Sequence, residues 1–152
     1  MSDGANKKSI FILHKKANTM EIKQNESTDL RPEGARVLDA PLVSIDLVEF
    51  IETIKDEPAW KNKDRNAITV YKTNGLRLVL VAMRKEAVLP RHTADGILSL
   101  QVFEGKINFT TDDKSVILEK GQMIALHKDL PHSVTAIKES VFLLTLTTSL
   151  NK

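Results

Sequence analysis

The sequence predicts an all-β fold of the sandwich or barrel type, formed by its second half. From Ala67 onward, short runs rich in β-branched and apolar residues recur about eight times, as in small β-domains. The runs cover residues 67–72, 76–83, 97–103, 106–110, 115–119, 122–126, 132–137 and 140–147. Turn-forming pairs separate several of them: Asn74–Gly75, Glu104–Gly105, Asp112–Asp113 and Lys120–Gly121. This regular spacing is typical of β-sandwiches and barrels. No helix-length segment interrupts it, which argues against a βαβ fold.

Residues 1–36 are polar and of mixed charge, and we expect them to form a flexible N-terminal arm. The arm contains one strand-like island, Ile10–Leu13, which can add a strand to the domain's own sheet or to a partner's sheet. The island is too short for the apolar core of a signal peptide or for a membrane span. We therefore expect a cytoplasmic protein without a membrane partner.

Residues 37–66 predict a helical segment packed on the barrel. Apolar residues recur at helical spacing at Leu47, Phe50, Ile51 and Ile54. Ser44 or Asp46 can cap the start of this one short helix, and Pro58 ends it. Trp60 follows, and two interpretations stay open: it plugs the contact between helix and barrel, or it stacks on a ligand.

Composition excludes several function classes. A chain of 152 residues fits one domain that buries a core without a disulfide or a structural metal. It has no cysteine, which removes disulfides, thiolate metal sites and cysteine nucleophiles. With 22 basic and 20 acidic residues the charge is nearly balanced, so nothing indicates a nucleic-acid partner.

Two of the four histidines lie in informative positions. His92 comes after a proline-bounded turn and His132 directly follows Pro131, and we expect each to begin a strand. In a closed barrel both side chains can face one interior, either as metal ligands or as hydrogen-bonded core groups. No third histidine, cysteine, aspartate or glutamate stands at a helpful strand spacing, which favours the second interpretation.

The region from about residue 67 to 148 resembles the cupins, small jelly-roll barrels with two glycine-and-histidine motifs. The joint pattern consists of Pro90, His92, Gly105, Gly121, Pro131 and His132. The resemblance implies a cupin-type jelly-roll barrel (a double-stranded β-helix) over residues 67–152. The N-terminal arm and the short helix precede this barrel.

The chain also departs from both motifs. In the first motif, the opening glycine, the second histidine and the glutamate are replaced by Glu86, Ala94 and Leu98. In the second motif, the proline, the glycine and the asparagine are replaced by His127, Asp129 and Ala136. We expect His127 to hydrogen-bond its turn or to face solvent.

These departures bear on the metal that the resemblance implies. Metal-binding cupins hold iron, manganese, zinc or a similar ion with three imidazoles and one carboxylate. Here His92 and His132 are kept, whereas a methyl group and an isobutyl group stand at the other two ligand positions. We therefore expect no resident cofactor. Weak binding of zinc, nickel, iron or manganese to His92 and His132 is the alternative.

The strand phase predicts a mostly apolar interior. If Leu98 points inward as the family glutamate does, Leu100 also points inward, because alternate residues of a strand share a face. By the same rule, an inward His132 places Val134 inward. The predicted ligand pocket consists of His92, Ala94, Leu98, Leu100, His132, Val134, Met83 and Met123. The competing interpretation is that these side chains simply fill the barrel.

We expect a binding or sensing protein for an unknown small molecule, acting as a homodimer. The dimer contact can come from Ile10–Leu13 or from residues 140–147 at a sheet edge. The alternative is a metal-dependent enzyme of the dioxygenase or isomerase class that uses His92 and His132 as partial ligands. The residues argue against catalysis, because no acidic partner orients either imidazole. Ser99, Ser133 and Thr135 are also out of phase with the interior, so no catalytic residue is assigned.

Overall fold

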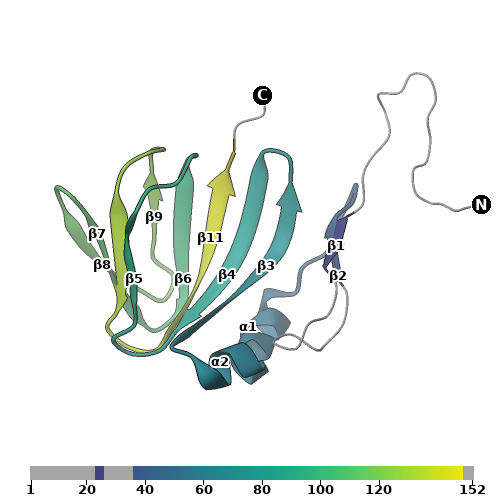
Figure 1. The fold of residues 1–152 in the computed structure, drawn as a ribbon, viewed down its shortest axis with the longest axis horizontal. Coiled ribbons are helices and arrows are strands. Elements are labelled where there is room, and N and C mark those ends of the chain that lie inside the picture. The colour runs from purple at the N-terminus through teal and green to yellow at the C-terminus, as the bar shows by residue number, and fades with distance from the viewer. Residues whose placement is uncertain (1–22, 26–35, 149–152) are drawn as a thin grey trace, which may run out of the picture.

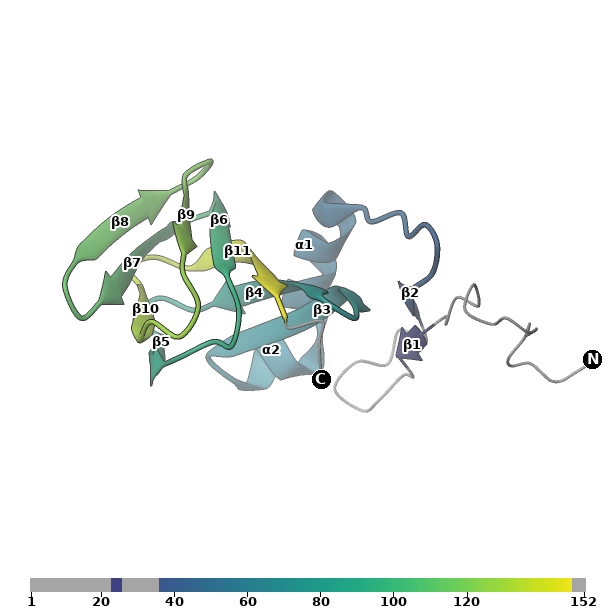
Figure 2. The ribbon, with the colours of Figure 1, turned by 90° about the horizontal axis from the view of Figure 1, so that it is seen from above.

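The computed structural model describes residues 23–25 and 36–148 and contains two antiparallel sheets that face one another (Figure 1, Figure 2). The five-stranded sheet has the order β3 (Arg65–Thr73), β4 (Leu76–Met83), β11 (Ser140–Thr147), β6 (Leu98–Glu104) and β9 (Met123–Leu126). The four-stranded sheet has the order β5 (Val88–His92), β10 (His132–Ala136), β7 (Lys106–Thr111) and β8 (Ser115–Glu119). The predicted all-β class is confirmed. The barrel is not closed, however, because no strand pair joins the two sheets within the described part of the chain.

Strand β11 lies in the middle of its sheet, with β4 on one side and β6 on the other. Both of its edges are therefore occupied along most of its length. The expectation that residues 140–147 offer an edge for a partner chain is wrong. Spacing alone does not reveal the order of strands in a sheet, so the sequence carried no signal for this.

Strand β5 was not expected as a separate strand, and it ends at His92 instead of starting there. It contains Pro90, which has no backbone N–H to donate to a ladder. The strand lies at the edge of its sheet, where one side needs no ladder partner, and the proline is tolerated.

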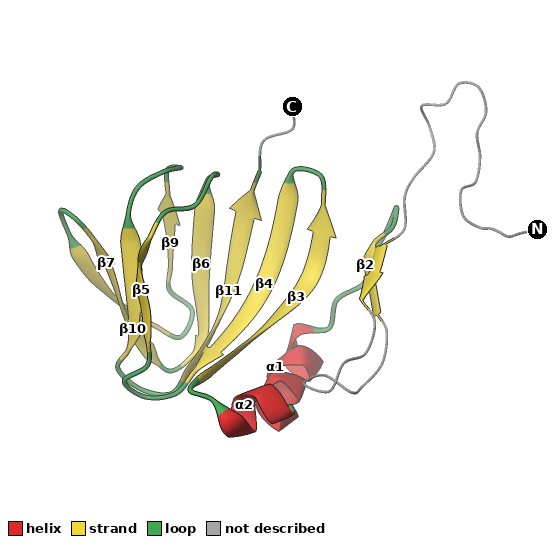
Figure 3. Ribbon diagram, in the orientation of Figure 1, coloured by secondary structure: helices red, strands yellow, loops and turns green. Residues whose placement is uncertain are grey.

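Two helices precede the barrel where one was expected. Asp46, not Ser44, caps α1 (Leu47–Asp56), and its side chain accepts a hydrogen bond from the Glu49 N–H at 3.1 Å. Pro58 ends α1 as predicted but also opens α2 (Pro58–Asn62), because its fixed backbone angle suits the first turn of a helix. The helices lie against β3 and β4 (Figure 3).

A small separate sheet lies beside the barrel. It pairs β1 (Lys23–Asn25) with β2 (Arg36–Asp39). The described part of the arm therefore contributes one strand, and that strand pairs outside the two barrel sheets. The segment expected to be helical also contains most of β2 and the start of β3. The island Ile10–Leu13 lies outside the described residues.

Alternation along β4 divides the apolar residues between two cores. Val81 and Met83 face the interior between the sheets, whereas Leu80 and Ala82 face the helices. Trp60 is 5% exposed and belongs to the core under the helices, which confirms the plug interpretation. The outer core anchors the helices, and the inner core contains the candidate site.

Candidate functional site

His92 and His132 meet across two paired strands. They are directly opposite each other in the register of β5 and β10. Their ring centroids lie 4.4 Å apart, with an angle of 59° between the ring planes. The fold therefore brings together two imidazoles that lie forty positions apart in the sequence.

Each imidazole is oriented by a backbone carbonyl two residues earlier in the chain. The Nδ1 of His92 lies 2.7 Å from the carbonyl oxygen of Pro90, and the Nδ1 of His132 lies 2.9 Å from that of Leu130. A carbonyl oxygen can only accept a hydrogen bond, so Nδ1 is the nitrogen that carries the proton in both rings. With the proton on Nδ1, a ring in its neutral form presents the Nε2 lone pair to an external donor or a metal.

The two histidines differ in burial. His132 is 4% exposed and stacks on Phe109, with ring centroids 5.5 Å apart and planes 12° apart. Phe109 belongs to the inner core, so His132 lies at the boundary of that core. His92 is exposed. The pair thus links the apolar interior to solvent.

Four of the predicted pocket residues belong to the inner core: Met83, Leu98, Leu100 and Val134. Their inward orientation agrees with the strand phase read from the sequence. Each is at most 5% exposed. The structure therefore places them inside the barrel, and their role as ligand contacts stays a prediction.

Met123 and Ala94 lie elsewhere. Met123 is 53% exposed, while its strand neighbours Ile124 and Leu126 pack against the inner core, so Met123 points outward and its assignment to the pocket is wrong. Ala94 lies in the loop between β5 and β6, partly buried, and its carbonyl accepts a hydrogen bond from the Asp129 N–H at 2.9 Å.

Burial of the side chains between the two sheets varies along the strands. Met83, Ala136 and Phe142 are fully buried. Seven inner-core side chains are only partly buried: Val79, Leu89, Val116, Ile124, Leu126, Leu144 and Leu146. We define the histidine end as the end of the barrel where β5 ends at His92 and β10 begins at His132; β4 also begins there and β11 ends there (Figure 1). Leu126 and Leu146 lie at the ends of β9 and β11 and are only partly buried, so this end of the barrel has some exposed apolar carbon.

The donor set does not fit a resident metal ion of the cupin type. The described residues contain no group of three or more His, Cys, Asp or Glu side chains that could hold a metal. Leu98, at the position of the family carboxylate, is 5% exposed within the inner core. Two imidazole nitrogens are fewer than the three or four protein ligands of a stable zinc site.

The backbone supports the alignment with the cupin motifs. In the described part of the chain, the non-glycine residues with positive φ are Glu86, at 74°, and Asp129, at 66°. Both stand where the motifs have a glycine. The motif glycines that are kept, Gly105 and Gly121, also have positive φ, at 86° and 85°. The departures thus preserve the left-handed turns while changing the side chains.

The remaining candidates lie away from the interior. His127 is exposed, as expected. Arg91 is exposed and donates hydrogen bonds to Asp112 at 2.8 and 3.0 Å. These bonds lower the pKa of the Asp112 carboxyl and raise the pKa of Arg91. This exposed ion pair joins the end of β5 to the turn after β7.

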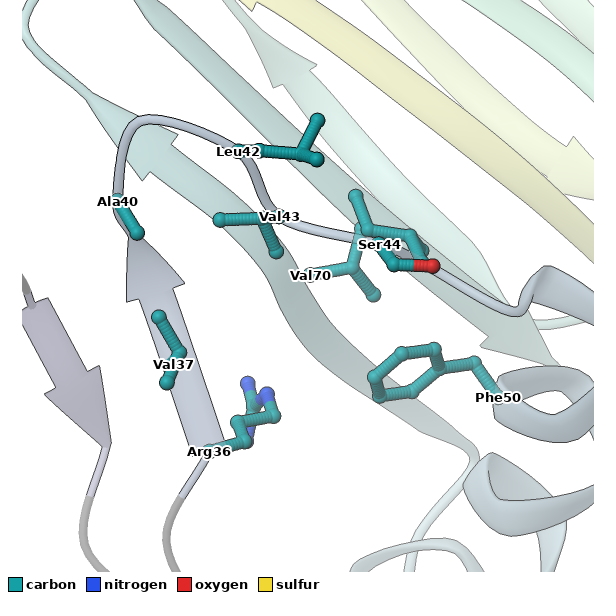
Figure 4. A pocket seen from close by; sticks show the side chains of 9 residues that line it. Arg36, Val37, Ala40, Leu42, Val43, Ser44, Phe50 and Val70 are labelled. Atoms are coloured by element: carbon teal, nitrogen blue, oxygen red, sulfur yellow. The ribbon is translucent and has the colours of Figure 1, made fainter.

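One hollow was not predicted from the sequence. It has a volume of about 410 Å³ and lies between β2, the segment before α1, and β3 (Figure 4). Its lining is mostly apolar: Arg36, Val37, Ala40, Leu42, Val43, Ser44, Ile45, Phe50 and Val70. The Arg36 guanidinium donates hydrogen bonds to the Thr69 carbonyl. The lining carries no carboxylate or imidazole, so it offers no acid–base chemistry.

One charged residue on the inner face of the barrel was also missed. Arg77 lies near the start of β4, in phase with Val79 and Val81. The signal was present in the run LRLVLVAM, where a period of two places the arginine on the same face as inward-pointing valines.

The comparisons with known proteins agree with this architecture. No family model matches the sequence, and the curated proteins yield no match. Among solved structures, a cupin-2 domain containing protein from Shewanella frigidimarina has a TM-score of 0.56 at 17% identity, over 68% of this chain and 93% of that one. KdgF from Halomonas sp. has a TM-score of 0.54 at 17% identity, over 57% and 80% of the two chains.

A third structure, the polyketide cyclase RemF from Streptomyces resistomycificus, has a TM-score of 0.52 at 15% identity, over 57% of this chain and 67% of that one. Within the described residues, no helix has the length and apolar character needed to cross a bilayer. The two facing antiparallel sheets agree with these structural matches. The protein has the cupin fold.

Proposed function

We propose that the protein binds a small, partly apolar molecule at the histidine end of its barrel. The observation that carries the proposal is the combination of partly exposed aliphatic side chains with two imidazoles of fixed orientation. Ligand sites are typically concave and apolar, with a few convergent polar groups that set the orientation of the ligand. Here the Nε2 atoms of His92 and His132 supply those groups.

The alternative function is that of a metal-dependent enzyme, a dioxygenase or an isomerase. Two free Nε2 atoms on adjacent rings favour it, because they are the atoms that imidazole ligands commonly offer. Against it stand Ala94 and Leu98, which supply neither the third imidazole nor the carboxylate. Solved cupin-fold structures include a polyketide cyclase, so the fold itself does not decide between binding and catalysis.

We propose further that the protein forms a homodimer. The barrel sheets have four edge strands, β3, β9, β5 and β8, at which a second copy can add to a sheet. Sedimentation velocity over a range of protein concentrations tests this. A single species of 17 kDa at all concentrations would contradict it.

The decisive test of the proposed function starts with protein purified without a histidine tag. Elemental analysis of the wild type measures iron, manganese, zinc and nickel, and a thermal-shift screen compares these ions with small organic molecules. We expect substoichiometric metal and stabilisation by an organic ligand, about 2.7 kcal/mol when the ligand is present at a hundred times its Kd.

Variants assign the effect to the site. His132→Ala should abolish stabilisation by the organic ligand, and His127→Ala is the matched control, since its imidazole is exposed outside the pair. Near-stoichiometric metal that is lost in both His92→Ala and His132→Ala would overturn the proposal in favour of the enzyme. Stabilisation by ions alone would do the same.

A further inference from the structure

We propose that the molecule bound at the histidine end carries a carboxylate, and that Arg77 receives it. This inference rests on the proposed function and adds the chemical class of the ligand.

Strand alternation places Arg77 on the inner face. Leu78 and Leu80 pack toward the helices, whereas Val79 and Val81 pack into the interior, and Arg77 is in phase with the second pair. The register confirms this, because Arg77 is directly opposite Leu146 of β11, which packs against the inner core.

The Arg77 guanidinium has no partner among the described residues. Its Nε is buried without a hydrogen bond, and no ion pair involves the side chain. The other arginines in the described part of the chain all donate: Arg36 to Thr69, Arg65 to Asp64, Arg84 to Trp60 and Lys63, and Arg91 to Asp112. A partly buried cation without an acceptor is unfavourable, and it gains most from an anion that binds beside it.

The side chains next to Arg77 in the sheet indicate which kind of anion fits beside it. One row of paired residues crosses the five-stranded sheet at the histidine end: Lys72, Arg77, Leu146, Leu98 and Leu126. Two adjacent cations are thus followed by three leucines, and no acidic side chain lies in the row. A ligand with a carboxylate at one end and an aliphatic body matches this order.

A guanidinium binds both carboxylates and phosphates with two parallel hydrogen bonds, and charge favours the carboxylate here. The guanidinium fork donates two parallel N–H bonds to the two oxygens of a planar carboxylate. Nε is the one nitrogen of Arg77 that is both buried and unpaired. A ligand would therefore reach the Nη atoms first. A single carboxylate also balances the one half-buried charge, while Lys72 is exposed to solvent.

Matched linear probes test the inference by calorimetry: hexanoate, 1-hexanol and hexyl phosphate. Wild-type protein should bind hexanoate at least tenfold more tightly than 1-hexanol or hexyl phosphate. Arg77→Met keeps the length of the side chain without its charge, and should bind hexanoate and 1-hexanol with equal affinity. Arg77→Lys should restore part of the preference, and the control Arg91→Met should leave it unchanged.

The outcomes separate this inference from the proposed function. If Arg77→Met binds hexanoate as tightly as the wild type, the role of Arg77 is refuted while binding at the histidine end stands. If hexyl phosphate binds as tightly as hexanoate, the carboxylate class is refuted. If none of the probes binds to the wild type, the inference and the apolar binding site both fail. Near-native circular dichroism of each variant shows that the fold is retained.

Discussion

Replacing Gly105 by alanine tests how the fold holds the end of β6 against the start of β11. Gly105 adopts φ of +86°, and a Cβ there would lie 2.2 Å from the carbonyl oxygen of Glu139 and 2.4 Å from Oγ of Ser140. Gly121 is a matched control, because its φ is +85° and its Cβ would meet no atom within 4 Å. The two substitutions therefore share a backbone cost and differ in steric overlap.

The magnitude follows from these contacts. A left-handed conformation destabilises the folded state by roughly 1–2 kcal/mol for an L-residue. Alanine also lowers the entropy of the unfolded chain, which offsets about 0.5–1 kcal/mol of this loss. Gly121→Ala should therefore destabilise by about 1 kcal/mol. At Gly105, the overlap also displaces the fully buried Ser140, whose hydroxyl accepts from the Lys106 N–H at 2.9 Å and donates to the Lys138 carbonyl at 2.7 Å. Losing two such bonds adds about 2 kcal/mol.

Urea unfolding followed by fluorescence of the single, buried Trp60 measures the free energy of unfolding of both variants. We expect Gly105→Ala to lose about 3 kcal/mol, or roughly 6–12 °C in Tm for a domain of this size. Gly121→Ala should lose roughly 2–4 °C. Equal losses in the two variants would refute the steric argument and leave only the backbone term.

Glu86→Gly should change the free energy of unfolding by less than about 1 kcal/mol, because relief of its positive φ offsets glycine's entropy; a larger loss in urea unfolding would show that the side chain matters. Asp46→Ala should cost about 1 kcal/mol by removing the cap of α1, and unchanged stability would contradict this. Partial burial lowers the pKa of Lys55, but its hydrogen bonds to Glu104 and Glu139 outweigh this and raise the pKa above the ordinary 10.5. The stability that Lys55 adds over Lys55→Met should therefore persist up to pH 10.5 and shrink as the pH rises further, which thermal unfolding across that range checks.

Local patterning was enough to predict most strands of the barrel and many of their inward-facing residues. The turns and the period of two fixed the phase of Leu98, Leu100 and Val134, because one face of each strand is buried. Met123 was misplaced although the same rule applies to it. Leu126 faces inward, and Met123 lies an odd number of positions away from it on β9. The two side chains are therefore on opposite faces, and Met123 points outward.

Other features depend on the order of strands in space, which periodicity does not reveal. Strand β5 was missed as a strand because its proline argues against a central position, and only the sheet order shows that the strand is an edge. The hollow beside β2 forms where residues 36–50 fold against Val70 of β3, a contact that periodicity does not reveal. The missing partner of Arg77 likewise becomes visible only when all neighbouring strands are in place.

The departures from the cupin motifs are of two physical kinds, and the structure separates them. Glu86 and Asp129 replace glycines yet keep positive φ, so the turns that set strand register are retained at some cost in backbone strain. Ala94 and Leu98 replace metal-binding side chains, and Leu98 packs in the core. The two glycine positions have therefore kept their backbone conformation although their side chains changed. The two ligand positions have lost the donor atoms that a metal would need. Under the proposed function, the polar groups that remain, two imidazoles and one guanidinium with an unpaired Nε, suit binding of an organic acid better than coordination of an ion.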